Sequence, residues 1–295
     1  MQTCKFCQSA KVVKHGVRAG VQRYRCNDCS HHFYATQATF ARMRANEHII
    51  VTALNLYYEG LSTRKVQKQL SDIYGEEVSA STVWYWVSKY GQLVGEYTKG
   101  LMPKLGGKYH HDETAIKVGG EEKWFWEMID SDTRYLVASH LSNTRTHEDA
   151  VAVFKQALEK QRPIALFTDG SFAYDEAFKK VFYSRYRTKQ VEWVRRVGIQ
   201  ARQTNNIVER LHGTLKDRLK PMRGLKHTDS AKRLLNGYVA HYNFCRTHSS
   251  IGTTPAQAAG LEVKGWKQLI EKAQAVKTTE EVQEKQAIEV EVRTK

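Results

Sequence analysis

The chain has 295 residues, of which 41% are hydrophobic, and its formal net charge is +15. This length accommodates one large domain and one or two small ones, and the apolar content is sufficient for a sizeable core. No run of about 18 apolar residues is present, and no apolar stretch follows the first residues, so we expect neither a transmembrane helix nor a secretory signal. We therefore predict a cytoplasmic protein without a membrane partner.

Positive charge is concentrated in residues 178–235, which contain 16 Lys and Arg residues against 4 Asp and Glu residues. A basic surface of this kind attracts a polyanion and accelerates its capture. The simpler alternative is a well-solvated, lysine-rich face. We favour a nucleic-acid partner, because the same segment contains the acidic residue Glu209, for which a role is predicted below.

Residues 1–36 contain two Cys-x-x-Cys pairs, Cys4/Cys7 and Cys26/Cys29, separated by 18 residues. In a reducing compartment such pairs favour a metal over disulfides. Four thiolates complete a tetrahedral shell and leave no open position for catalysis. We therefore predict a zinc ribbon that holds one structural Zn²⁺ ion.

Between the two cysteine pairs, residues 12–16 and 22–25 have the pattern of a hairpin with a basic exposed face. His31 and His32 are alternative zinc ligands, but the two cysteine pairs already satisfy the metal. Cys245 stands apart from the pairs and is expected to be a small core residue.

Residues 44–98 predict three short helices. Apolar residues recur at helical spacing within 49–57, 66–73 and 83–90. Ser62 is placed to cap the second of these helices. This arrangement is typical of a helix-turn-helix DNA-binding domain, although an ordinary three-helix bundle has the same pattern.

The following segment alternates strands and helices in the order of an RNase H-like α/β fold, that is, a mixed sheet flanked by helices. Three strands form a meander, with Gly119-Gly120 as the first turn. A helix and a short apolar strand come next, and the apolar run is typical of a buried parallel strand. The predicted elements are strands 108–118, 123–129 and 135–139, helix 146–160, strand 164–167, helix 171–182, strand 191–194 and a long helix that begins near Asn206.

We assign this α/β domain to residues 108–260, which we interpret below as catalytic. The remaining residues, 261–295, are polar and of mixed charge toward their end. They are predicted to form a C-terminal helical or flexible tail.

Three acidic residues occupy three different elements of the predicted catalytic domain. Asp112 lies on the first strand, Asp169 directly follows the buried strand, and Glu209 lies in the first turn of the long helix. Open α/β sheets place their ligands at strand ends, so the three carboxylates can converge. Grouped carboxylates tolerate one another when divalent cations lie between them. Two Mg²⁺ or Mn²⁺ ions about 3.5–4 Å apart would then support in-line transfer of a phosphodiester.

Each acidic residue also has a structural explanation. Asp112 can pair with a neighbouring Lys or His, and Asp169 can simply form a turn. Asn206 and Glu209 have the spacing of a capping box at a helix start. Asp130, Asp132 and Asp175 are reserve acids that we interpret as turn residues.

Three segments resemble the catalytic segments of insertion-sequence transposases of the DDE superfamily, which also includes retroviral integrases. They are His111-Asp112-Glu113-Thr114, Phe167-Thr168-Asp169-Gly170 and Asn205-Asn206-Ile207-Val208-Glu209-Arg210. Lys216 follows Glu209 by two helical turns and faces the same side, and a basic residue there is typical of the family. Residues 242–256 resemble the closing segment of the family, and the resemblance covers roughly residues 108–258.

This resemblance implies a DNA transposase that binds insertion-sequence ends and catalyses strand cleavage and strand transfer. Asp112, Asp169 and Glu209 would be catalytic magnesium ligands, and Lys216 would position the DNA. Double-stranded DNA, as transposon ends and as target, is the implied partner, and joining two ends implies a homodimer or a larger assembly. The alternatives are a non-enzymatic DNA-binding regulator and an RNase H-type nuclease.

Overall fold

The computed structural model has two separate hydrophobic cores, of which the smaller is built around Cys4, Cys26 and Phe33. The larger core extends continuously from Ile49 to Ala273. None of the helices in the described part of the chain combines the length and the apolar character that a membrane span requires. The structure describes residues 3–4, 6–7, 9–18, 21–34, 40, 43, 45–186, 189–195, 199–222 and 225–293.

The N-terminal unit is a three-stranded antiparallel sheet in the order β1-β2-β3. Strands β1 (Val12–Arg18) and β2 (Val21–Cys26) form the predicted hairpin. Strand β3 (His32–Tyr34) was not expected, and it brings Phe33 against the small core. Residues 1, 2, 5, 8, 19, 20, 35 and 36 of the predicted ribbon lie outside the described residues.

Three helices follow, α1 (Glu47–Tyr58), α2 (Thr63–Tyr74) and α3 (Ala80–Lys99), close to the predicted positions. Ser62 caps α2, because its side chain accepts a hydrogen bond from the Lys65 amide at 3.3 Å. Helix α2 ends at Gly75, whose φ of 66° suits a glycine at the end of a helix.

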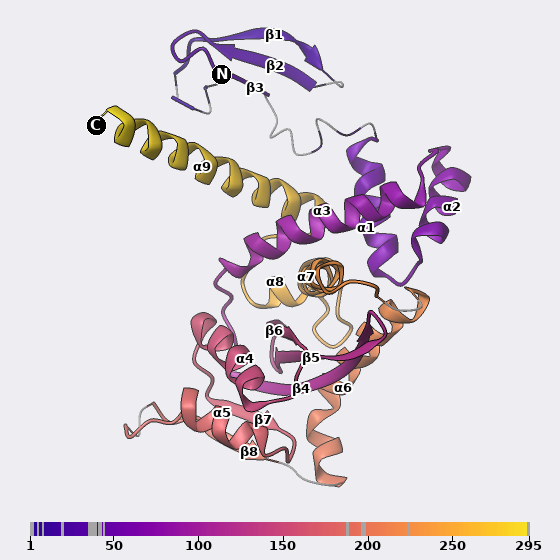
Figure 1. Ribbon diagram of the computed structural model, residues 1–295, viewed down its shortest axis with the longest axis vertical. Coiled ribbons are helices and arrows are strands. Elements are labelled where there is room, and N and C mark those ends of the chain that lie inside the picture. The colour runs from indigo at the N-terminus through magenta and orange to yellow at the C-terminus, as the bar shows by residue number, and fades with distance from the viewer. Residues whose placement is uncertain are drawn as a thin grey trace.

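The central sheet has five strands in the order β6-β5-β4-β7-β8 (Figure 1). The first three form the predicted antiparallel meander, and β7 and β8 add in parallel to β4. This mixed sheet with helices on both faces confirms the predicted RNase H-like α/β fold. The strands are β4 (Lys108–Val118), β5 (Glu121–Asp130), β6 (Leu136–Ser142), β7 (Ala165–Thr168) and β8 (Glu192–Arg195).

Helices cover both faces of this sheet. On one face, His111 of β4 packs against Phe154 and Tyr174, which belong to α4 (His147–Lys160) and α5 (Ala173–Val181). On the other face lies α6 (Ile199–Leu219), whose His212 approaches Glu127 of β5. Because neighbouring strand residues point to opposite faces, His111 and the adjacent Asp112 face different helices.

Helix α6 begins at Ile199, seven residues before the predicted start near Asn206. The prediction was wrong because the Asn206-x-x-Glu209 spacing imitates a capping box. The chain contains no Gly or Pro between residues 199 and 212, so nothing interrupts the helix on the N-terminal side of Asn206. Glu209 therefore lies in the middle of α6 and cannot cap its first turn. A 3₁₀ turn over Lys220–Met222 ends the helix.

The three-helix unit (α1 to α3) docks on the α/β unit through α7 (Thr228–Phe244). Two glycines of α3 allow the close approach. A β-carbon at Gly91 would lie 2.6 Å from the Arg233 carbonyl oxygen, and one at Gly95 would lie 2.7 Å from the Asn236 Cβ. Since the two units share one core, the predicted boundary between residues 98 and 108 stays a prediction.

The C-terminal segment is helical. A short helix, α8 (Pro255–Ala258), precedes the long helix α9 (Gly265–Arg293). The first turns of α9 belong to the core, where Trp266 is fully buried and stacks on Tyr58 of α1 with ring centroids 5.2 Å apart. Part of the predicted tail thus holds the three-helix unit in place.

Candidate active site and zinc site

The four cysteines of the N-terminal unit form one cluster, in which all sulfur atoms lie within 4.8 Å of one another. A tetrahedral zinc site with bonds of about 2.3 Å places its sulfurs about 3.8 Å apart, so this cluster fits Zn²⁺. Hydrogen bonding from the Cys29 amide lowers the pKa of Cys26 to about 6, which favours a thiolate at that position, whereas the pKa values of Cys7 and Cys29 are raised among the clustered sulfurs.

The two histidines weighed as alternatives serve other contacts. His31 Nδ1 lies 2.9 Å from the Cys29 carbonyl oxygen, and its ring stacks on Phe6. The His32 ring packs edge-on against His15. Among the described residues, the metal cluster contains cysteines only.

Asp112 on β4 and Asp169, directly after β7, come at corresponding positions of two neighbouring parallel strands. The register pairs His110 of β4 with Phe167 of β7, and each aspartate comes two residues later. Asp112 Oδ1 accepts a hydrogen bond from the Glu113 amide at 3.0 Å, and Asp169 Oδ1 accepts one from the Ser171 amide at 2.8 Å. Asp169 thus also shapes the turn after β7, and its second oxygen remains for another ligand.

Burial and neighbouring carboxylates raise the pKa of Asp112 to about 7. Burial is the larger cause, and the charges of Glu113 and Asp169 add to it. The charged form of Asp112 is therefore disfavoured at this buried position. A divalent cation between Asp112 and Asp169 would remove that penalty, so the pair fits a metal site.

Helix α6 carries the other two candidate residues. Val208, Leu211 and Leu215 are buried against the sheet, whereas Glu209 and Lys216 are exposed. The positive charge of Lys216 contributes to the lowered pKa of His212, which places Lys216 beside that residue. The structure thus brings Asp112 and Asp169 together and sets Glu209 and Lys216 along the helix that covers the same face of the sheet.

Two residues near Asp112 were missed by the sequence reasoning. Glu127 is fully buried and is the direct cross-strand partner of Asp112. His212, also buried, places its Nε2 at 3.3 Å from Glu127 Oε2. The signal was available, since a two-residue turn at Gly119-Gly120 fixes the register and pairs residue 112 with residue 127.

Glu113, next to Asp112, is held on the opposite face of the sheet. Its carboxylate accepts hydrogen bonds from the Arg145 side chain and from the Tyr174 hydroxyl. The Arg145 guanidinium also lies over the Trp124 ring, 4.7 Å from its centroid. These contacts make Glu113 an anchor for α5 and for the loop before α4.

The reserve acids have structural partners. The Asp130 carboxylate accepts hydrogen bonds from the amides of Gly106, Gly107 and Thr133, which fixes the turn after β5. Asp175 pairs with Arg195 at 3.3 Å. Asp130 is thus the turn residue that the sequence interpretation expected, whereas the interpretation was wrong for Asp175, which lies in the first turn of α5.

A small basic cavity of about 170 Å³ lies beside the exposed side of α6. Arg210 contributes from α6, Arg134 from the turn before β6, and Arg246 and His248 from the segment that resembles the family's closing motif. This cavity places cationic side chains next to the helix that carries Glu209.

Residues 106–248 match the family model described as a DDE domain, and residues 29–123 match the one described as Transposase, Mutator family. The transposase for the insertion sequence-like element IS431mec of Staphylococcus aureus is 25% identical over 205 residues, which cover 69% of this chain and 87% of that protein. The chain is thus similar to insertion-sequence transposases with a DDE domain.

Two further proteins are similar to this chain. An uncharacterized protein of Methanocaldococcus jannaschii is 29% identical over 144 residues, which is 48% of this chain and 64%, less than two thirds, of that protein. The catalytic core domain of HTLV-2 integrase, solved with magnesium, is 17% identical and superposes with a TM-score of 0.41 over 54% of this chain and 99% of that domain.

Proposed function

We propose that this protein is a metal-dependent DNA transposase that cleaves insertion-sequence ends and joins them to target DNA. The observation that carries this proposal is that Asp112 and Asp169 each come two residues after the paired positions His110 and Phe167 of β4 and β7, within the segment that matches a DDE domain. The raised pKa of Asp112, caused mainly by burial and then by neighbouring carboxylates, supports the same proposal, because perturbed carboxyl groups are enriched at functional sites.

In this proposal Asp112, Asp169 and Glu209 hold two Mg²⁺ or Mn²⁺ ions. When bound, such ions activate the attacking oxygen and stabilise the leaving oxygen in phosphodiester transfer. Lys216 binds a DNA phosphate and orients the strand, since an ammonium group near the site is a donor and cannot accept a proton while it is charged. Arg134, Arg210 and Arg246 would bind further phosphates beside it.

Two transfers take place in sequence. Water first attacks the phosphodiester at the element end, which breaks the P–O3′ bond and leaves a free 3′-hydroxyl. That hydroxyl then attacks a target phosphodiester, forms the new P–O bond and releases the target's own 3′-hydroxyl. Each step breaks one P–O bond and forms another, so neither step needs a covalent enzyme intermediate.

DNA recognition is assigned to the N-terminal zinc ribbon and to the exposed face of α3. That face carries Ser81, Tyr85, Ser88 and Lys89, and the Tyr85 side chain is 53% exposed. The third helix of a helix-turn-helix domain can enter the major groove of DNA, and α3 is the third helix of this unit. Two ends must be joined, so the working form would be a dimer or a larger assembly on DNA.

The test is a strand-transfer assay with pre-cleaved duplex carrying the element end. Asp112→Asn and Asp169→Asn should each reduce product by orders of magnitude and leave end binding intact, because basic contacts elsewhere supply most of the affinity. Asp132→Asn, an exposed turn residue, is the matched control. Cleavage of an RNA–DNA hybrid in preference to duplex ends would favour a nuclease, and end binding without any cleavage would favour a regulator.

A further inference from the structure

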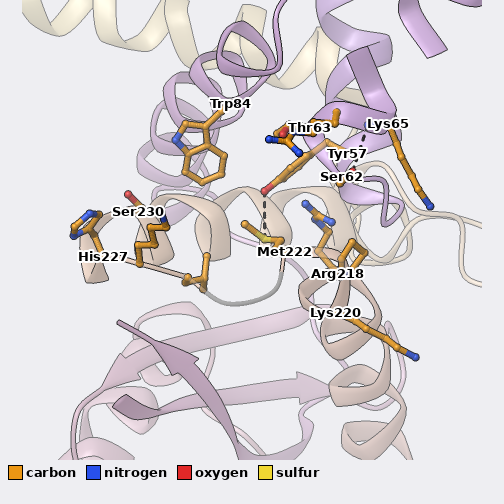
Figure 2. A pocket seen from close by; sticks show the side chains of 14 residues that line it. Tyr57, Ser62, Thr63, Lys65, Trp84, Arg218, Lys220, Met222, His227 and Ser230 are labelled. Carbon is orange, nitrogen blue, oxygen red and sulfur yellow. Dashed lines mark hydrogen bonds between the residues drawn. The ribbon is translucent and has the colours of Figure 1, made fainter. Parts of the chain in front are cut away.

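A cleft of about 760 Å³ separates the three-helix unit from the C-terminal end of α6 (Figure 2). Its upper wall comes from α1, α2 and α3, through Tyr57, the first turn of α2 and Trp84. Its lower wall comes from the end of α6 and the following 3₁₀ turn, through Arg218 and Lys220. The cleft lies at the end of α6 that follows Lys216, outside the proposed active site.

Arg218 is the unusual residue of this cleft. Its side chain is only 1% exposed, and its guanidinium carbon lies 3.6 Å from the centroid of the Tyr57 ring. Its three side-chain nitrogens make no hydrogen bond of acceptable geometry with the described residues, although the Tyr57 hydroxyl interacts electrostatically with the guanidinium. No acidic side chain in the described part of the chain forms an ion pair with it either.

A buried arginine without acceptors is costly for the fold. Arginine stays protonated in proteins, so it cannot lower this cost by losing its charge. The contact with Tyr57 offsets part of the cost as a cation–π interaction, but it satisfies none of the five N–H donors. An anion that accepted hydrogen bonds from the guanidinium would remove the penalty.

The rest of the cleft is suited to an anion. Its lining includes no Asp or Glu among the described residues, whereas Arg64, Lys65, Lys220 and Lys226 surround it with positive charge. Ser62 and Thr63, at the N-terminus of α2, also line it. The amides of a helix N-terminus carry partial positive charge and bind anionic oxygens, so α2 and Arg218 act on the same space.

We propose that this cleft is a phosphate-binding site that takes a backbone phosphate of DNA. The planar guanidinium donates two parallel hydrogen bonds, which match two oxygens of one phosphate. The assignment to DNA rests on the proposed function. DNA is the favoured ligand because one wall of the cleft belongs to the three-helix unit and the other to α6. A DNA strand bound to both α3 and the proposed active site would therefore pass the cleft that contains Arg218.

The first experiment uses inorganic phosphate as the probe and thermal unfolding of the full chain as the readout. Phosphate should raise the midpoint of the wild-type protein above that in chloride of equal ionic strength. Arg218→Met should abolish this rise without lowering the midpoint in chloride, because methionine fills similar space beside Tyr57 without a charge. Arg185→Met, which removes one charge from an exposed position, should keep the wild-type response.

Variants at two exposed residues on the rim of the cleft keep the proposal testable if Arg218→Met fails to fold. Lys65→Met and Lys220→Met leave the core untouched and should each weaken the phosphate response. A full phosphate response in Arg218→Met, or in both rim variants, would overturn the proposed site.

The second experiment measures binding of end-bearing duplex between about 50 and 200 mM salt. Loss of one phosphate contact should lower the slope of log K against log salt by about one and weaken binding about tenfold. An unchanged slope in Arg218→Met, beside a lost phosphate response, would overturn the DNA assignment and point to a free phosphate compound. Failure of the wild-type chain to bind duplex would overturn the proposed function instead and leave the phosphate response intact.

Discussion

Glu127 lies directly across the β4–β5 ladder from Asp112, and its carboxyl group is fully buried. Burial raises its pKa well above the ordinary value, and the charge of Asp112 adds to this effect. On its other side stands His212, whose pKa burial lowers to about 4. Burial therefore favours the neutral form of both groups, a protonated Glu127 carboxyl and an uncharged His212 ring, next to Asp112.

The proton on the Glu127 carboxyl makes the stability of the fold depend on pH. In the unfolded chain Glu127 and His212 titrate near about 4.3 and 6.5, so above pH 6.5 they hold almost no proton. Folding then takes up about one proton, and stability falls as pH rises from about 6.5 toward the raised pKa of Glu127, by about 1.4 kcal/mol per pH unit.

Glu127→Gln should flatten this fall, because an amide does not titrate, and should raise stability at pH 8 in the presence of EDTA. The measurement is denaturant unfolding between pH 6.5 and 9. Glu122→Gln, an exposed neighbour on the same strand, should behave like the wild type. Parallel pH profiles for wild type and Glu127→Gln would show that the buried carboxyl is ionised in the folded state.

Some elements were predictable because local chemistry specifies them. Strand β4 has the predicted bounds, Lys108–Val118, because Gly119 and Gly120 adopt φ of 67° and 87° in the turn that closes the hairpin. The apolar run before Asp169 predicted β7 for a similar reason, since a short apolar segment bounded by polar residues favours a buried strand.

Other features depend on contacts between distant segments. The docking of α3 on α7 requires Gly91 and Gly95, whose role becomes visible only when Arg233 and Asn236 lie opposite them. Arg218 belongs to a basic stretch that the sequence alone suggests is exposed. In the structure it is covered by Tyr57, which lies on a helix more than 150 residues earlier in the chain. No periodicity in the sequence signals such contacts.

The zinc ribbon yields a prediction about metal content. Cys26→Ser should reduce zinc from one ion per chain to none, because three thiolates bind the metal far less tightly. The N-terminal sheet should unfold, while the α/β unit keeps its transition, since the two have separate cores. Metal analysis of reduced protein and thermal unfolding check both effects, with Cys245→Ser as the control that should retain zinc. A wild-type protein free of zinc would refute this assignment.

The exposed face of α3 yields a prediction about recognition. Lys89 Nζ lies 5.8 Å from the Tyr85 ring centroid and 5.3 Å from that of Tyr90. If it binds phosphate, Lys89→Ala should weaken binding to all duplex sequences and lower the salt slope by about one. Lys155→Ala, exposed on α4, serves as the charge-matched control. Equal slopes for Lys89→Ala and the wild type would remove Lys89 from the DNA surface.

The last prediction concerns Glu209, the third proposed metal ligand. Because α6 begins at Ile199, Glu209 has no capping role, and Glu209→Gln should leave the thermal midpoint unchanged. Strand transfer should nevertheless fall by orders of magnitude, since the amide keeps the size of the side chain but removes the charge that binds a divalent cation. End binding should persist or strengthen slightly, because one negative charge near the DNA is lost.

Two further variants on α6 separate metal binding from general helix effects. Asp217→Asn removes an exposed carboxylate from the same helix and should keep wild-type transfer. Lys216→Ala should reduce transfer less than Glu209→Gln does, because it removes one phosphate contact and no metal ligand. Mg²⁺ or Mn²⁺ should support the reaction, whereas Ca²⁺ should support binding with little turnover, since its larger and looser shell suits in-line transfer poorly. Near-wild-type product from Glu209→Gln would mean that the third ligand is a different acid on the face of the sheet that α6 covers.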